Sequence, residues 1–385
     1  MKTPVVIDCV RTPIGRAHKD KGYYRHTRSD DLAVGVVRAL LERTGIDPAE
    51  VEDVVFGNVQ QQGEQGFNVA RNVALMAGLP LQTAGATVNR LCGSSLQALN
   101  QAAHSIIAGA EDVQIVGGLE HMHHVPMDAG LDLNPKLLHR TSKGALNMGY
   151  TAEFLAQSQG ISREEQDQYA CRSHQRAAQA HQSGKFRKEI VPTWARDPEG
   201  NRFLATWDQT VRPDCSMEGL AALKPAFMPG VGTVTAGNSS PLNDGAAAML
   251  VMSQEKAKAL GLKPLVRIVA SAVVGVEPAV MGTGPVPATR KVLKRAGLTL
   301  QDIGLIELNE AFAAQTIACI RMLELDQEKL NVRGGAIAIG HPLGASGVRI
   351  ATTLIHAMID HDVEWGLATM CIGIGQGIAT LFQRI

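Results

Sequence analysis

The sequence is short of aromatic residues and carries no net charge. Phe, Trp and Tyr make up 4% of its 385 residues, and 37 basic residues balance 37 acidic ones. A neutral chain lacks the broad basic surface that binds nucleic acids or anionic membranes, so we expect neither as a partner. A small molecule that bears phosphate needs only a few local cations and is not excluded.

Cysteines and long apolar runs are also scarce. The 6 cysteines are too sparse for a disulfide scaffold, and no two form a CxxC pair. The apolar run at 4–7 is too short for a signal peptide. No uncharged apolar stretch approaches the ~20 residues that cross a bilayer. We therefore expect a cytoplasmic protein with reduced thiols that is not an integral membrane protein.

Glycine, in contrast, is abundant, with 39 residues. Because glycine has no side chain, this frequency predicts many close backbone approaches rather than large aromatic pockets. The hydrophobic fraction of 45% is ordinary for a chain that buries a large core. Since a typical domain has ~150 residues, a chain of this length is expected to form two or three domains.

Segments separated by 252 residues resemble one another. Each pair shares the end of an amphipathic helix or a short apolar strand: 40–46 with 292–298, 54–56 with 306–308, 104–107 with 356–359, and 113–116 with 365–368. One constant offset across several elements indicates two copies of one α/β unit. In the first pair, both helices are predicted to end at a glycine cap.

The copies differ after their last shared strand. In the second copy, residues 368–371 and 377–382 form a predicted hairpin. In the first copy, the equivalent closing strand at 246–252 follows only after a long, more polar excursion, which includes a predicted helix capped by Ser162. We therefore divide the chain into a first half at 1–118 completed by 245–258, an insertion at 119–244, and a second half at 259–385.

Cys92 stands at the start of a predicted helix, in the run NRLCGS at 89–94. The following apolar residues keep a helical spacing at Leu96, Leu99, Ala103, Ile106 and Ile107. Unpaired N–H groups and the positive end of the helix dipole favour a thiolate at such a position. A lone cysteine there is more often a small buried core residue, so the position alone does not establish a nucleophile.

A second reactive segment lies at the equivalent place in the other half. By the same offset Cys92 matches Gly344, within GHPLGASG at 340–347. His341 in this run is held between glycine and proline, a rigid turn suited to project an imidazole into a cleft. A single histidine in such a turn is more often structural than catalytic.

Two further polar groups follow predicted strands. Cys371 ends one strand, and the alternating glycines after it leave backbone N–H groups free to face an oxyanion. Asn309 follows the strand at 306–308. Together with Cys92 and His341, these residues supply two thiols, an imidazole and an amide at strand ends and helix starts.

These motifs resemble the thiolase family. The resemblance rests on NRLCGS at 89–94, NEAF at 309–312, GHPLGASG at 340–347, CIGIG at 371–375, GNSSPLNDG at 237–245 and RTPIG at 11–15. It runs from end to end of the chain. It implies an α/β fold of two βαβαβαββ halves, layered as α/β/α/β/α, with an inserted loop domain that binds CoA.

The resemblance also implies roles for the reactive residues. Cys92 is the nucleophile that attacks the 3-keto carbon of a 3-ketoacyl-CoA and holds the acyl group as a thioester, and His341 takes its proton. Cys371 protonates the acetyl-CoA enolate and then deprotonates the incoming CoA. One oxyanion hole uses His341 and a water held by Asn309, and the other uses the N–H groups of Cys92 and Gly373. No metal or redox cofactor is implied, and CoA is a substrate.

CoA is expected along the insertion. By alignment to the family motifs, Arg212 meets the nucleotide end, while Phe227, Ala236 and Ser240 line the pantetheine channel. The alternative is that Arg212 is a solvated surface residue with no role in CoA binding.

One position departs from a pattern within the family. Thiolases specific for acetoacetyl-CoA carry histidine before the Met-Gly of the loop that covers the thioester, whereas Asn147 precedes Met148 here. Asparagine can still form hydrogen bonds but does not titrate. The change favours a degradative enzyme of fatty acid β-oxidation that shortens longer acyl chains by two carbons.

The resemblance extends to the thiolase subunit of the bacterial fatty acid oxidation complex. It implies a homodimer within a heterotetramer that contains a multifunctional hydratase/dehydrogenase subunit. Alternatives are an acetyl-CoA acetyltransferase that works in the condensing direction and a non-catalytic acyl-CoA-binding subunit. A decarboxylating ketoacyl synthase is disfavoured by the second thiol, Cys371. The histidines at 121–124 lack a supporting Cys/His group, so no metal site is predicted.

Overall fold

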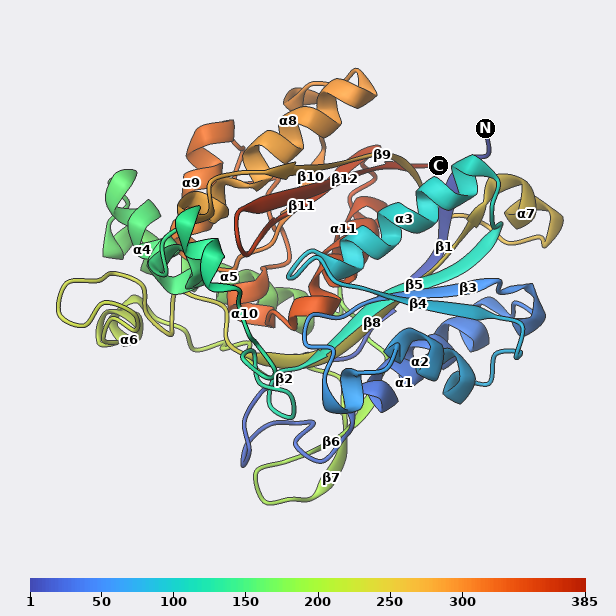
Figure 1. The fold of residues 1–385 in the computed structure, drawn as a ribbon, viewed down its shortest axis with the longest axis horizontal. Coiled ribbons are helices and arrows are strands. Elements are labelled where there is room, and N and C mark those ends of the chain that lie inside the picture. The colour runs from blue at the N-terminus through green and yellow to red at the C-terminus, as the bar shows by residue number, and fades with distance from the viewer.

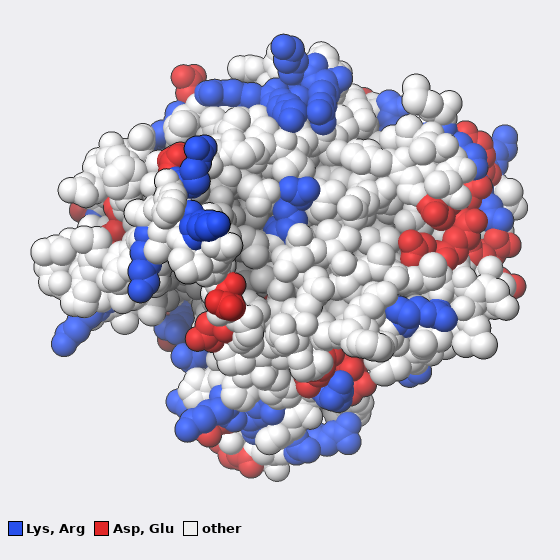
Figure 2. Space-filling view, in the orientation of Figure 1, with Lys and Arg blue, Asp and Glu red and all other residues white.

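The computed structural model describes residues 1–385, which form a mixed α/β protein. Strands pair into one sheet of ten strands in the order β10-β11-β12-β9-β1-β8-β5-β3-β4, with the short β2 (Gly15–Arg16) beside β8. No helix is long and apolar enough to cross a membrane. Figure 2 shows side chains of both charges spread over one face, and neither sign covers it.

The first half of the chain alternates strands and helices before it closes with an antiparallel strand. Its elements are β1 (Pro4–Arg11), α1 (Ser29–Thr44), β3 (Asp53–Gly57), α2 (Val69–Ala77), β4 (Ala84–Val88), α3 (Ser94–Ala108), β5 (Val113–His121) and β8 (Asn243–Ser253). β8 pairs antiparallel with both β1 and β5, whereas β3 pairs parallel with β4 and β5. This is the βαβαβαββ order that the family resemblance implies.

The second half repeats most of this order. Its elements are β9 (Val266–Gly275), α8 (Pro285–Ala296), β10 (Leu305–Leu308), α9 (Ala313–Leu323), α10 (Ala336–Ile339), α11 (Ser346–Asp360), β11 (Trp365–Ile372) and β12 (Gln376–Arg384). The starts and ends of α3 and α11 differ by the predicted 252 residues. Gly45 and Gly297 cap α1 and α8 in the left-handed conformation, so the predicted helix ends are confirmed.

The second half differs in one strand. The expected third strand is reduced to an isolated bridge between Ile306 and Leu330. The side chain of Asn331 takes the place of the missing ladder, because its Oδ1 accepts from Leu308 N and its Nδ2 donates to Leu308 O, both over 2.9 Å. An amide side chain thus satisfies the backbone groups that a neighbouring strand would otherwise pair.

The two halves stack as layers around α3 and α11 (Figure 1). One buried cluster joins these two helices to strands of both halves, including Leu96 and Leu354 of the helices with Val55 and Met370 of the strands. Separate clusters pack α1 and α2 against the first-half strands and α8 and α9 against the second-half strands. The layered α/β/α/β/α core is therefore confirmed. Only two residue pairs, between β1 and β9, join the halves into one sheet.

The segment between β5 and β8 holds α4 (Met148–Ser158), α5 (Arg163–Gln182), β6 (Thr193–Arg196), β7 (Arg202–Ala205) and α6 (Met217–Ala221). Ser162 caps α5 through a capping box with Glu165, as its sequence predicts. A remaining short helix, α7 (Gln254–Ala259), follows β8.

Candidate active site

Cys92 lies in the tight turn between β4 and α3. The preceding Leu91 has a φ of 45°, a left-handed conformation that costs a residue with a side chain ~1–2 kcal/mol. Gly93 then begins the helix so close to β11 that a Cβ there would lie 2.6 Å from Ile372 Cδ1. This strained turn therefore places Cys92 next to β11 of the second half. The Cys92 side chain is partly exposed there.

Cys371 approaches the same place from the end of β11. Its side chain is 2% exposed. The residues that follow it lie against the Cys92 turn, because a Cβ on Gly93 would come 2.6 Å from Ile372 Cδ1 and a Cβ on Gly373 would come 3.3 Å from Leu91 Cδ1. Burial raises the pKa of the Cys371 thiol well above its ordinary value, and ionisation of Cys92 or Cys319 would raise it further. Two thiols that share a site in this way can exchange protons with one substrate.

Burial also raises the pKa of the Cys92 thiol, to about 11. The backbone N–H groups of Gly373 and of Cys92 itself act in the opposite direction but do not outweigh desolvation. The N–H groups at the helix start thus favour the thiolate, as expected, but burial favours the neutral thiol more strongly. The same contacts put the N–H groups of Gly373 and Cys92 at the sulfur, and their role as an oxyanion hole stays a prediction.

His341 is 4% exposed and is held by three hydrogen bonds to protein atoms. Its backbone N–H donates to Asn243 Oδ1 over 2.8 Å, and its Nδ1 lies 2.6 Å from Ser346 Oγ. The Ser346 hydroxyl donates its one hydrogen to Pro342 O over 2.8 Å, so it accepts from Nδ1–H of the imidazole. This tautomer leaves Nε2 without a proton and able to accept one.

Asn309 faces that free nitrogen. It follows β10, is 1% exposed, and its Nδ2 lies 3.4 Å from His341 Nε2. Burial, followed by the charge of Arg349, lowers the pKa of His341 to about 3, so the imidazole is neutral over the physiological range. No hydrogen bond joins His341 to Cys92, but Leu343 of the same loop packs near Cys92. A buried neutral base, in a loop that packs near Cys92, is suited to acyl transfer through a covalent thioester.

Comparison with known protein families agrees with this geometry. Residues 4–255 match the family described as "Thiolase, N-terminal domain", and residues 262–384 match "Thiolase, C-terminal domain". The chain belongs to the thiolase family.

Individual relatives of this thiolase match it over its full length. Proteins named "3-ketoacyl-CoA thiolase" from Pectobacterium carotovorum and Vibrio cholerae are 56% and 54% identical, each over 100% of both chains. The solved human mitochondrial 3-ketoacyl-CoA thiolase is 38% identical with a TM-score of 0.92, and the solved Bacillus anthracis acetyl-CoA acetyltransferase is 39% identical with a TM-score of 0.91. Each structure match covers 100% of this chain and 99% of the other. The predicted family and fold are confirmed.

Two of the predicted substrate residues lie next to the thiols. Met148 and Phe227 pack against a cluster that includes Cys371 and Phe312. Phe227 stands edge-on to Phe312 with ring centroids 6.0 Å apart. It also lies against Gly149, where a Cβ would come within 2.1 Å of its ring. These apolar side chains form one wall beside Cys371.

The other predicted substrate residues also belong to the insertion. Arg212 and Ala236 are exposed, and Ser240 donates its backbone N–H to Ala311 O over 3.0 Å. Asn147 is exposed and caps α4, because its Oδ1 accepts from the N–H groups of Gly149 and Tyr150. The amide oxygen of Asn147 is thus engaged with the helix, and its contact with substrate stays a prediction. The sequence did not predict this cap.

The sequence did not predict the residues whose hydrogen bonds orient His341 and hold its loop in place. Ser346 and Asn243 lie inside quoted motifs, yet only the fold shows that they orient His341. Glu120, fully buried, accepts from Val59 N, Gln60 N and Gly344 N and so ties the loop of His341 to the first half. Burial of a polar residue is the signal that marks such supports, and it becomes visible only in the structure.

A group of possible metal ligands includes none of the predicted catalytic residues. Glu64, His121 and His124 place one ligand atom each within 4.8 Å of one another. The two imidazoles stack with centroids 3.8 Å apart and planes inclined by 15°, so their in-plane lone pairs do not converge. Nε2 of each ring also bonds to a backbone carbonyl, of Tyr24 and Arg25 respectively. The prediction of no metal site stands as a prediction.

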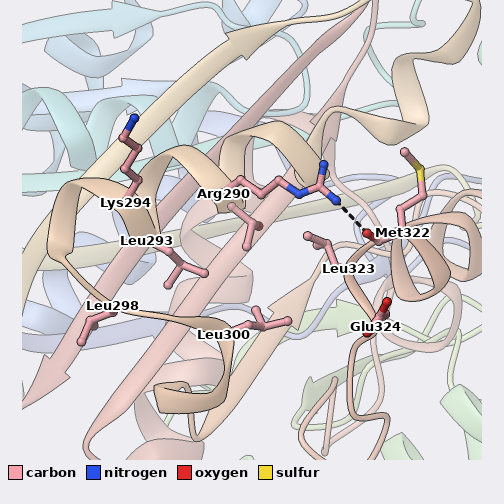
Figure 3. Close-up of a pocket in the computed structure, with 9 residues that line it drawn as sticks. Arg290, Leu293, Lys294, Leu298, Leu300, Met322, Leu323 and Glu324 are labelled. Atoms are coloured by element: carbon pink, nitrogen blue, oxygen red, sulfur yellow. Dashed lines mark hydrogen bonds between the residues drawn. The ribbon is translucent and has the colours of Figure 1, made fainter.

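A surface cavity of about 390 Å³ lies on the outer layer between α8 and α9 (Figure 3). Arg290 bridges it by donating from Nη2 to Met322 O over 2.9 Å. None of the predicted catalytic residues lines this cavity, so it is separate from the thiol site of the thiolase.

Proposed function

We propose that this thiolase cleaves 3-ketoacyl-CoA with CoA, yielding acetyl-CoA and an acyl-CoA shortened by two carbons. The observation that supports the proposal most is the approach of the turn that holds Cys92 to the end of β11, where Cys371 lies, together with the buried, neutral imidazole of His341. One thiol carries the acyl group and the other moves protons, as a two-stage acyl transfer requires. The names of the bacterial relatives support the same substrate class.

The first stage forms an acyl-enzyme. Cys92 gives its proton to His341 Nε2 as its sulfur attacks the 3-keto carbon of the substrate. The bond between C2 and C3 then breaks, its electron pair forms the enolate of acetyl-CoA, and Cys371 protonates that enolate at C2. The acyl group remains on Cys92 as a thioester.

The second stage regenerates the enzyme. The Cys371 thiolate takes the proton of an incoming CoA thiol, and the CoA sulfur attacks the thioester carbonyl. Collapse of the tetrahedral intermediate releases the shortened acyl-CoA and the Cys92 thiolate, which regains its proton from His341. The raised pKa of Cys371 suits it to give and take protons between carbon and sulfur.

Two groups of donors stabilise the negative oxygens in these stages. The N–H groups of Cys92 and Gly373 face the thioester oxygen. At the other carbonyl, Nε2 of His341 becomes a donor once it has accepted the Cys92 proton, beside a water held by Asn309. Removal of one such donor in other enzymes costs about 10²–10³ in kcat.

CoA occupies the side of the molecule formed by the insertion. Its pantetheine arm runs beside Phe227, Met148, Ala236 and Ser240, and the exposed Arg212 meets its phosphates. The proposal uses CoA as a substrate and requires no metal or redox cofactor.

The enzyme is proposed to act in the cytoplasm as a homodimer. All six cysteines are free, as in proteins of a reducing compartment. β4 is an edge strand of the sheet, its residues are partly or fully exposed, and Leu81 nearby is 76% exposed. A second copy that pairs with this edge would cover it. A multifunctional hydratase/dehydrogenase subunit completes the proposed complex.

The deciding experiment is a thiolysis assay with 3-ketoacyl-CoA substrates of graded chain length, with and without the large subunit. We expect turnover on chains longer than C4, and a Cys92→Ala control that folds but is inactive. Activity on C4 alone would favour the acetyl-CoA acetyltransferase alternative, which the solved Bacillus anthracis relative makes a specific rival. Binding of acyl-CoA without turnover would favour a non-catalytic subunit.

A further inference from the structure

Arg349 on α11 has a fully buried guanidinium with few partners. Its Nη2 donates to Asn309 Oδ1 over 3.4 Å, and its Nη1 lies 3.9 Å from Glu307 Oε2. Nε and Nη1 of Arg349, like Oε2 of Glu307, have no hydrogen-bond partner among the protein atoms. A buried charge with so few partners costs stability rather than adding to it. A contribution to the stability of the fold therefore does not explain why an arginine occupies this position.

The first half of the chain provides an internal comparison. By the 252-residue offset, Arg349 and Glu307 correspond to Gln97 on α3 and Val55 on β3. Val55 belongs to the apolar core, and Gln97 is partly exposed. The same packing of helix on strand therefore forms without a buried arginine and glutamate. The pair occurs only in the half that supplies the imidazole and the amide.

The contacts of Asn309 determine which way its amide faces. Arginine has N–H donors and no acceptor, so Arg349 bonds to Oδ1 of the amide and not to Nδ2. Nδ2 is then directed toward His341 Nε2. With the amide reversed, its oxygen would face the lone pair of Nε2, and its NH₂ group would face the guanidinium. Both of those contacts are repulsive.

We propose that Arg349 is a positioning residue of the thiolase reaction, whose guanidinium holds the Asn309 amide with its N–H groups toward His341 and the substrate oxygen. The inference rests on the proposed function and adds a residue to it. Without Arg349 the amide is free to rotate, and the donor that holds the oxyanion-hole water is lost for part of the time.

The charge of Arg349 has a second effect on the site. It lowers the pKa of His341, in addition to the larger effect of burial, so the imidazole stays neutral and able to accept the Cys92 proton. The charged groups that act on Arg349 itself come from several elements: Glu307, Arg11, Glu310 and Glu189. Glu307 lies on β10, 3.9 Å from Arg349 Nη1. Burial raises the pKa of Glu307 to about 8.

The test compares Arg349→Gln and Arg349→Lys with Arg333→Gln as a matched control. Arg333 is also a buried arginine, 2% exposed, but its Nη2 donates to His356 O and Asp360 Oδ2, away from the catalytic groups. Arg349→Gln removes both the positive charge and the planar set of guanidinium N–H donors. Arg349→Lys keeps the charge but loses the planar set of donors. For each variant we would measure thermal unfolding, kcat and KM for thiolysis, and the titration of His341 by NMR of ¹⁵N-labelled imidazole.

We expect Arg349→Gln to lower kcat by about 10²-fold, the loss that small misplacement of a catalytic group produces, with little change in KM. Its His341 should titrate at higher pH than in the wild type, because a nearby positive charge is lost. Arg349→Lys should lower kcat and leave the His341 titration unchanged, so it carries the test if the glutamine variant does not fold. Arg333→Gln should change neither quantity per folded molecule.

The inference is overturned if both Arg349 variants keep the kcat of Arg333→Gln. It is also overturned if the titration of His341 is the same in Arg349→Gln and in the control. Failure of the proposed function is a separate result: wild-type protein would then cleave no 3-ketoacyl-CoA, and the titration of His341, which needs no substrate, would decide the role of Arg349.

Discussion

His341 Nδ1 lies 2.6 Å from the hydroxyl oxygen of Ser346, which donates its own hydrogen to Pro342 O. One hydroxyl hydrogen cannot serve two acceptors, so the imidazole must be the donor in the first bond. Ser346 thereby selects the tautomer in which Nε2 is the free base. The reaction of Cys92 depends on that selection.

We predict that Ser346→Ala lowers kcat by about 10²-fold or more, since an imidazole in the wrong tautomer cannot accept the thiol proton. Thermal unfolding should change little, because a small buried hydroxyl is lost. Ser253→Ala, which removes another buried serine at the cap of α7, is the matched control. Equal kcat values in the two variants would show that Ser346 does not set the tautomer.

The raised pKa of Cys92 leads to a prediction about its reactivity in the free enzyme. Because burial raises this pKa to about 11, the thiolate fraction should keep growing with pH above neutrality. We expect the rate of alkylation of Cys92 by iodoacetamide, followed by peptide mass spectrometry, to rise up to pH 10. A rate that reaches its plateau by pH 7 would mean that the helix start dominates after all.

Replacement of the second thiol should separate the two stages. Cys371→Ala removes the group that protonates the enolate and deprotonates CoA, so overall turnover should fall by at least about 10²-fold. Cys92 should still form some acyl adduct, detected by mass spectrometry of the intact protein. Cys319→Ala, another buried free cysteine, should keep normal turnover. Normal turnover in Cys371→Ala would remove it from the mechanism.

A buried ion pair ties the start of the chain to the insertion. Arg11 Nη1 and Nη2 lie 2.6 and 3.0 Å from the two carboxylate oxygens of Asp208, and both side chains are fully buried. Asp208→Asn removes one of the two carboxylates that pair with Arg11, since Glu189 Oε1 still accepts from Nε over 2.7 Å. The loss should lower the free energy of unfolding by about 1–3 kcal/mol. Chemical denaturation at pH 7 measures this loss, and an unchanged midpoint would contradict it.

The same pair predicts a dependence on pH. Burial alone would raise the pKa of Asp208, but the charge of Arg11 and the bond from His181 outweigh it and bring the pKa well below its usual range. The unfolded chain therefore binds a proton near about pH 4 that the folded protein does not bind. The stability due to Asp208 is complete above that pH and is lost as pH falls. The difference between wild type and Asp208→Asn should shrink in acid, and a constant difference would contradict the assignment.

Much of the fold followed from the sequence because the duplication is local and periodic. The offset of 252 residues predicted the paired helices α3 and α11, and glycine caps marked the ends of α1 and α8. The missing strand near Leu330 was not predictable, since the side chain of Asn331 replaces its backbone bonds. Such a replacement depends on where a side chain lies in the fold and leaves no periodic trace.

The site was predicted less completely. The thiols and the imidazole stand in long motifs, whereas the pKa of Cys92 depends on burial that no spacing reveals. Asn147 was expected to contact substrate from the loop pattern, yet its side chain caps α4. Arg349 lies two residues beyond a quoted motif, and only its burial and its contact with Asn309 show a role.

The central claim is that Cys92 carries the acyl group, and trapping that intermediate tests it most directly. The enzyme would be mixed with a 3-ketoacyl-CoA in the absence of free CoA, quenched in acid, digested, and analysed by mass spectrometry. We predict that the acyl group from C3 onward is found on the peptide that contains Cys92, and that Cys92→Ala abolishes it. An acyl group on Cys371 instead, or full thiolysis by Cys92→Ala, would contradict the account.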